Sequence, residues 1–398
     1  MERTKQKNRW AMLACICANT FCFGGVYAWS AFSSELATQM GCDYSQVTIA
    51  YSIMLTAIAA MGLVGGILLQ RFGARKLIRI AGIMWGLGWL LTGFSTSLPM
   101  LYLSFGLLAG SASGFGYTPC VVTAVSWFSD KKGFASGMAV GICGMASLIV
   151  APLANALLTR FDALTAFRIV GGLFLVISLA TSWYIDSPSA AKGACSGAAP
   201  AQAGKNWREM LRDPRGVLLW ATMLCASVAG LTLIGHASKI GQEVAGITAA
   251  QAALLVGIMA VANFLGRLVL GSLSDVVGRH QVVIGVMVAC ALDMLFLSKV
   301  HSFMGFVTAI VIAGVCFGGT LATFSALTSD TFGPQYNGLN YSIIFTGYGI
   351  AAIVGPNVAT AIKSSTGSYS GAFLFAAGCS VLAAVLCILA KKMDKKHG

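Results

Sequence analysis

Long apolar runs, separated by short polar stretches, follow one another along the whole chain. Each run is close to the roughly 20 residues that a helix needs to cross a bilayer. The runs cover approximately residues 10–34, 46–70, 77–95, 99–127, 133–158, 165–185, 215–241, 248–273, 281–298, 303–328, 337–362 and 369–390. This pattern predicts an all-α membrane protein with twelve transmembrane helices.

One long polar segment interrupts the pattern between the sixth and seventh runs. It extends from Ser187 to Arg215 and is rich in small residues first and basic residues later. We therefore expect an N-terminal six-helix bundle (1–186), a linker (187–214) and a C-terminal six-helix bundle (215–398).

The two halves carry matching segments at a nearly constant offset. The pairs are GILLQRFGARK from Gly66 and GSLSDVVGR from Gly271, Pro152 and Pro356, and WAMLAC from Trp10 and WATMLC from Trp220. Parallel repeats of six helices are typical of the major-facilitator architecture. The sequence thus predicts two pseudo-symmetric bundles.

Composition supports a membrane protein. Hydrophobic residues make up 57% and charged residues 10% of the 398 positions, with mean hydropathy +0.80, whereas soluble domains carry about 25% charged residues. The net charge of +13 is not a nucleic-acid signal, because most of the 26 lysines and arginines fall in segments on one side of the expected topology. This positive-inside bias places both termini in the cytoplasm, and we expect the bacterial inner membrane as the location.

Neither a metal nor a cofactor nor an enzymatic activity is expected. The twelve cysteines contain no CxxC pair and are interpreted as small packing residues. There is no Walker loop, and the glycine-rich runs lie inside apolar segments without a preceding strand.

Arg267 is a permanent cation within the apolar run 249–273. An arginine at membrane depth costs about 2.5–3.5 kcal/mol even on lenient insertion scales. A protein acid such as Asp293, Glu35 or Asp330 would offset this cost, and so would a substrate carboxylate. We favour the substrate, because a guanidinium binds a carboxylate through two parallel hydrogen bonds. Asn263, four residues earlier on the same helix face, would add a neutral donor.

The loop after the eighth helix contains Gly271, Asp275, Gly278 and Arg279. It resembles the signature loop of the major facilitator superfamily. The resemblance implies a charged latch that holds one conformation of two rocking halves. The first-half copy has Gln70 in place of the acid, which weakens a latch there.

Further segments resemble the oxalate:formate antiporter family within the monocarboxylate-transporter group. They are GGVYAWSAF from Gly24, YSQ from Tyr44, WFSDKKGFASG from Trp127 and NFLGR from Asn263. The resemblance covers essentially the whole chain. It implies alternating access and places the anion-binding arginine at Arg267.

Aromatic residues on the expected cavity helices are candidate substrate contacts, although packing explains each one better when it is taken alone. They are Tyr27, Tyr117, Phe345 and Tyr348. Oxalate exchangers of this family carry a lysine near the position of Tyr348. One arginine balances one carboxylate, so its absence favours a monocarboxylate.

Proton coupling has two candidate carriers, Asp293 inside the ninth run and His236 near the outer end of the seventh. The alternatives are a buried polar contact for Asp293 and an interfacial role for His236. Lys239 keeps oxalate open, because it can supply a second positive charge.

These observations predict a secondary transporter of small monocarboxylates such as lactate, pyruvate or formate, working as a proton symporter or an anion exchanger. An oxalate:formate antiporter is the first alternative, and a transporter-like ligand sensor is the second. The expected partners are the substrate, protons and the lipid bilayer, without nucleic acid, and the expected state is a monomer.

Overall fold

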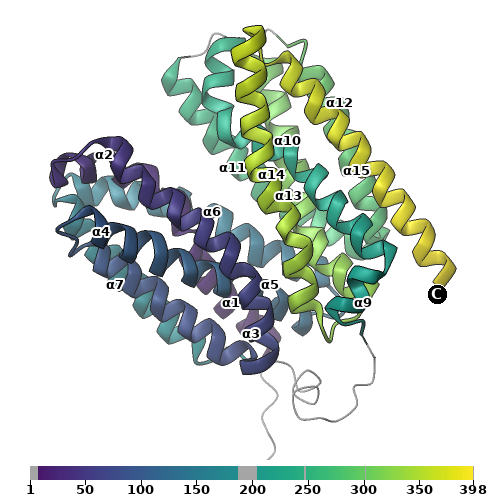
Figure 1. The fold of residues 1–398 in the computed structure, drawn as a ribbon, viewed down its shortest axis with the longest axis horizontal. Coiled ribbons are helices and arrows are strands. Elements are labelled where there is room, and N and C mark those ends of the chain that lie inside the picture. Colours follow the sequence, from purple (N-terminus) through teal and green to yellow (C-terminus); the bar gives the residue numbers. More distant parts are fainter. Residues whose placement is uncertain (1–7, 187–203, 246–247, 301, 398) are drawn as a thin grey trace, which may run out of the picture. The chain divides into compact units, whose positions relative to one another are not determined.

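The computed structural model describes residues 8–186, 204–245, 248–300 and 302–397, and every element in these ranges is helical (Figure 1). The elements are α1 (Arg9–Phe23), η1 (Gly24–Ala28), α2 (Trp29–Met40), α3 (Tyr44–Thr92), α4 (Leu98–Leu101), η2 (Tyr102–Ala109), α5 (Gly110–Trp127), α6 (Lys132–Leu158), α7 (Ala163–Ser182), α9 (Trp207–Arg212), α10 (Pro214–Ala245), α11 (Ala249–Val277), α12 (Arg279–Leu297), α13 (Phe303–Phe332), α14 (Asn337–Thr366) and α15 (Ser370–His397). Most of the predicted linker, residues 187–203, lies outside the described ranges.

Eleven helical stretches of the described ranges are long and apolar enough to cross a membrane. One of them, in α3, contains two of the twelve predicted spans. Gly73 separates these two spans, since its φ of 74° and ψ of 163° are not helical. Glycine adopts positive φ without the steric penalty that a Cβ imposes. The predicted class, an all-α membrane protein, is confirmed.

The first predicted helix is not continuous. A 3₁₀ turn, η1, lies between α1 and α2. A Cβ at Gly24 would collide with the backbone carbonyl of Cys143 on α6, and one at Gly25 would meet the ring of Phe174 on α7. The helices therefore approach more closely here than larger residues would permit. The fourth predicted helix likewise includes a π-helical stretch, η2.

The chain forms two compact units. Unit 1 contains residues 1–129 and 142–201, and unit 2 contains residues 130–141 and 202–398. The first turns of α6 thus group with unit 2, although the sequence places them in the N-terminal bundle.

In unit 1, α3 packs against α5 and α7, and α1 packs against α5 and α7. Its core is a cluster of aromatic rings. Trp89 is completely buried, and its ring centroid lies 5.2 Å from that of Phe167, 5.5 Å from that of Phe105 and 5.7 Å from that of Trp85. Such offset and edge-on pairs add to the stabilisation from apolar burial.

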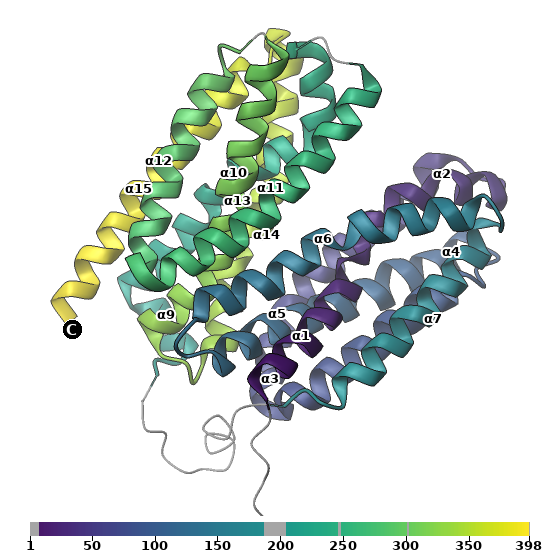
Figure 2. The ribbon, with the colours of Figure 1, turned by 180° about the vertical axis from the view of Figure 1, so that it is seen from behind.

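In unit 2, α11 packs along α13, α10 packs along α14, and α12 packs along α15. Both views place α10, α13 and α14 side by side (Figures 1 and 2). Glycines bring α11 and α13 into backbone contact. A Cβ on Gly318 would collide with the carbonyl of Asn263, and one on Gly266 would collide with that of Val315. This close packing fixes the face of α11 that carries Asn263 and Arg267.

A charged cluster joins the start of α10 to the end of α15. Arg215 contacts Asp213 at 2.7 Å and Asp394 at 2.8 Å, Lys205 contacts Asp213 at 2.6 Å, and His280 lies 3.3 Å from Asp394. Burial raises the pKa of Asp213, but hydrogen bonds from Arg215 and Lys205 outweigh it and hold that pKa well below its usual value.

Candidate functional site

Arg267 is buried, with 7% of its surface exposed. Its Nη1 donates a hydrogen bond to the backbone carbonyl of Val140, which belongs to the 130–141 stretch of unit 2. Its Nε is buried and finds no acceptor among the described residues. Within those residues no carboxylate forms an ion pair with Arg267. A buried guanidinium without an anionic partner is a costly arrangement.

None of the acids that the sequence offered as counter-ions pairs with Arg267 in the described part of the chain. Asp330 pairs with Lys132 at 2.5 Å and with Arg279 at 3.2 Å. Asp293 on α12 is 4% exposed, and neither carboxyl oxygen has a hydrogen-bond partner in the described part of the chain. Glu35 belongs to unit 1.

The guanidinium has five N–H donors in a rigid planar fork. Nη1 is engaged with a carbonyl, whereas the edge formed by Nε and Nη2 makes no hydrogen bond with the described residues. The N–H groups of this edge are spaced to donate one hydrogen bond to each oxygen of a carboxylate. The arrangement can therefore bind one carboxylate side-on while Val140 holds the other end of the group.

Asn263 lies one turn earlier on α11 and is 8% exposed. Its backbone carbonyl faces Gly318 of α13. Residues four apart share a helix face, so the Asn263 amide and the Arg267 guanidinium lie on one side of α11.

Aromatic rings on α14 form a continuous row in unit 2. The ring centroids of Tyr341 and Phe345 are 5.6 Å apart, and those of Phe345 and Tyr348 are 4.8 Å apart and nearly parallel. Phe317 of α13 stacks on Tyr348 at 6.2 Å. Trp220 of α10 completes this region by donating a hydrogen bond from Nε1 to the hydroxyl of Thr346, at 2.9 Å.

Tyr341 is the residue of this row that sequence reasoning missed. It is completely buried, and both Arg267 and Tyr348 lie near enough to interact with it electrostatically. A signal was present, because Tyr341, Phe345 and Tyr348 have the i, i+4, i+7 spacing of one helix face.

The other predicted contacts lie in unit 1. Tyr27, in η1, is 50% exposed, and Tyr117 lies in α5, two residues before Pro119, with intermediate burial. Their roles stay predictions. The side chains of His236 and Lys239 lie outside the described residues, so proton coupling through His236 also stays a prediction.

The predicted latch residues form one network. The Asp275 carboxylate accepts hydrogen bonds from the backbone N–H groups of Gly133 at 2.9 Å and Phe134 at 3.0 Å, in the first turn of α6. Arg279 pairs with Asp275 at 2.5 Å. A carboxylate at a helix N-terminus satisfies free N–H groups and complements the helix dipole.

Two glycines permit this network. Gly278 has a φ of 105°, which lets the chain turn between α11 and α12. Gly271 lies against the carbonyl of Gly133, with an ideal Cβ position only 2.6 Å away, so a larger residue would push the two segments apart. Whether the network controls a conformational change remains a prediction.

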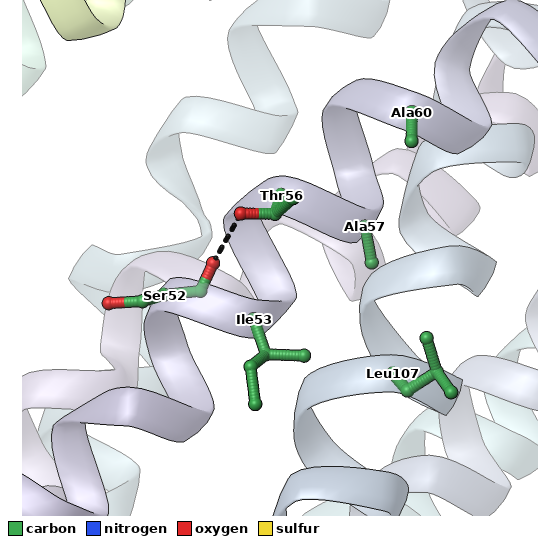
Figure 3. Close-up of a pocket in the computed structure, with 6 residues that line it drawn as sticks. All are labelled: Ser52, Ile53, Thr56, Ala57, Ala60 and Leu107. Atoms are coloured by element: carbon green, nitrogen blue, oxygen red, sulfur yellow. Dashed lines mark hydrogen bonds between the residues drawn. The ribbon is translucent and has the colours of Figure 1, made fainter.

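A pocket of about 420 Å³ lies in unit 1 (Figure 3). Its lining residues are Ser52, Ile53, Thr56, Ala57, Ala60 and Leu107. None of them carries a charge, so this pocket has no group that would neutralise a buried anion, unlike the surroundings of Arg267.

The family profile of the Major Facilitator Superfamily matches residues 13–356 and 242–397. The chain therefore belongs to this superfamily. It is 33% identical over 350 residues to the MFS-type transporter YhjX of Escherichia coli (strain K12), covering 87% of each chain. It is also 28% identical over 382 residues to the oxalate:formate antiporter of Oxalobacter formigenes, covering 95% of this chain and 90% of that protein.

Solved structures with the same fold include the E. coli fucose:proton symporter, with a TM-score of 0.74 at 14% identity, covering 95% of this chain and 98% of that chain. A proton:xylose symporter matches with a TM-score of 0.73 at 13% identity, covering 95% and 94%. The family and the structural neighbours are transporters, so the protein is an integral membrane transporter and not an enzyme.

Proposed function

We propose that the protein transports small monocarboxylates such as lactate, pyruvate or formate, and that Arg267 binds the carboxylate. The observation that carries this proposal is a buried guanidinium that has no anionic partner among the described residues and keeps its Nε edge unengaged. A substrate carboxylate would neutralise this charge and use that edge. Asn263 and the α14 aromatic residues would complete the shell around the substrate.

Charge balance favours a monocarboxylate over a dicarboxylate. One arginine and one carboxylate form a neutral pair, whereas a second carboxylate would add an uncompensated charge at membrane depth. Tyr348 is stacked between Phe317 and Phe345 and presents no cation. Tyr27 and Tyr117 are proposed as further contacts from unit 1.

The transport cycle would be alternating access, with a substrate site near the middle of the membrane. The network of Asp275, Arg279 and the first turn of α6 would stabilise one conformation and release in the other. Coupling would be proton symport, with Asp293 or His236 as the carrier, or exchange of one anion for another. We place the protein as a monomer in a bacterial inner membrane, with both termini in the cytoplasm.

Oxalate:formate exchange is the second candidate, because the Oxalobacter formigenes relative bears that name. Counterflow in proteoliposomes separates the two. Vesicles preloaded with lactate, pyruvate, formate or oxalate are given the labelled acid outside, with Arg267→Gln vesicles as the matched control. Lactate, pyruvate or formate should exchange and oxalate should not. Rapid oxalate exchange without lactate or pyruvate exchange would refute the monocarboxylate assignment.

A further inference from the structure

The hydroxyl of Tyr341 has no hydrogen-bond partner among the described residues, although the side chain has no exposed surface. A buried polar group without a partner lowers stability. Phenylalanine would fill the same space without this cost. The hydroxyl is therefore expected to gain a partner in another state of the protein.

Arg267 has the same deficiency on its Nε. Gly318 of α13 lies against the backbone nitrogen of Arg267, and the neighbouring Phe317 stacks on Tyr348. Tyr348 belongs to the same row of rings on α14 as Tyr341, so this row and the α11 segment with Arg267 pack on the same part of α13 in unit 2. The Tyr341 hydroxyl could accept a hydrogen bond from Nε–H, but no hydrogen bond joins the two groups in the structure. An acceptor with more than one oxygen can satisfy both.

We propose that Tyr341 donates a hydrogen bond to the carboxylate held by Arg267, which rests on the proposed function. Tyr341 is then a substrate-binding residue of the closed complex, in which water is excluded. The hydroxyl is neutral, so it strengthens anion binding and leaves the pairing of one cation with one carboxylate unchanged. Hydrogen bonds to a charged group are stronger than those between neutral groups.

The row of rings on α14 supports this placement. Phe345 packs against Tyr341 on one side and stacks on Tyr348 on the other. The exposure increases along the row, from Tyr341, which is fully buried, to Tyr348, which is half-buried. The Tyr341 hydroxyl, at the buried end of this apolar row, would hydrogen-bond the carboxylate, while the rings contact the carbon chain of the substrate.

The test is Tyr341→Phe, which removes only the hydroxyl, and the control is Tyr336→Phe, at the residue that precedes the same helix. Affinity for lactate, pyruvate and formate is measured by counterflow, and thermal unfolding is measured without ligand. We expect Tyr341→Phe to weaken affinity about tenfold or more, as for a hydrogen bond to a charged group. Its unfolding temperature without ligand should equal or exceed that of the wild type.

A double-mutant cycle with Arg267→Lys gives a second readout. Two donors to one carboxylate should show non-additive losses. Additive losses, or an affinity equal to that of Tyr336→Phe, would overturn the role of Tyr341 while leaving the proposed function intact. If the wild type exchanges none of the three acids, the proposed function fails and the role of Tyr341 fails with it.

Discussion

Arg267→Lys keeps the positive charge and removes the planar fork. In the structure the guanidinium uses Nη1 for the carbonyl of Val140 and has its Nε edge unengaged. A lysine ammonium is a point charge that cannot hold both the carbonyl and two carboxylate oxygens in this geometry. Losing one charge-assisted hydrogen bond costs about 1.5–3 kcal/mol. Since 1.4 kcal/mol corresponds to about tenfold in affinity, we expect a loss of about ten- to a hundredfold.

Removing the positive charge of Arg267 tells its role in substrate binding apart from its contribution to the stability of the protein. For Arg267→Met, the membrane penalty of about 2.5–3.5 kcal/mol disappears, and the hydrogen bond to Val140, worth about 1.5–3 kcal/mol, is lost as well. The two ranges give a net change between about 0.5 kcal/mol of lost stability and about 2 kcal/mol of gained stability without ligand, centred on a gain of about 1 kcal/mol. Stabilisation by added carboxylate should vanish.

The assay combines counterflow in proteoliposomes with thermal unfolding in detergent, each with and without lactate. Wild-type uptake by Arg267→Lys would refute the reasoning. So would strong destabilisation of Arg267→Met without ligand, because that result would mean that the guanidinium has an anionic partner within the protein.

Three of the other predictions concern charge inside the membrane or at the latch. Tyr348→Lys adds a cation, so affinity for oxalate in thermal-shift measurements should rise, and unchanged selectivity counts against the charge argument. Asp293→Asn should flatten the pH dependence of uptake and keep anion exchange, if Asp293 carries the proton; an unaltered pH profile excludes that role. Asp275→Asn removes a carboxylate that accepts hydrogen bonds from two N–H groups at the start of α6. The free energy of unfolding should therefore fall by about 0.5–2 kcal/mol. An unchanged unfolding midpoint together with an unchanged rate of substrate exchange would show that the latch is inert. Because the pKa of Asp213 is lowered in the folded protein, the stabilisation that its carboxylate provides is complete above about pH 4 and is lost as the pH falls toward the pKa of the folded state. The difference in unfolding temperature between the wild type and Asp213→Asn should therefore become smaller in acid. A difference that stays constant with pH would contradict this.

The helices were predictable because apolar runs of membrane length leave few alternatives to helical structure. Breaks within them were harder to predict. The Gly24 turn looks in sequence like many other glycines in the chain. Its effect depends on the backbone that approaches it, which is the Cys143 carbonyl. Such contacts arise from packing between distant segments.

The candidate site was predicted to a similar extent. A cation in an apolar run stands out in sequence, so Arg267 and its helix neighbour Asn263 are predicted from sequence alone, and so are Phe345 and Tyr348; their roles in binding stay predictions. Tyr341 was not identified, because an unpartnered hydroxyl becomes visible only when its surroundings are known. The pairing of Asp330 with Lys132 of α6 and Arg279 of α12 likewise depends on tertiary contacts.

The most direct measurement is an experimental structure of the protein with bound lactate. The account predicts the two carboxylate oxygens within hydrogen-bond distance of Nε and Nη2 of Arg267, and one of them near the hydroxyl of Tyr341. Lactate bound elsewhere, with Arg267 paired to an aspartate or glutamate of the chain, would contradict it.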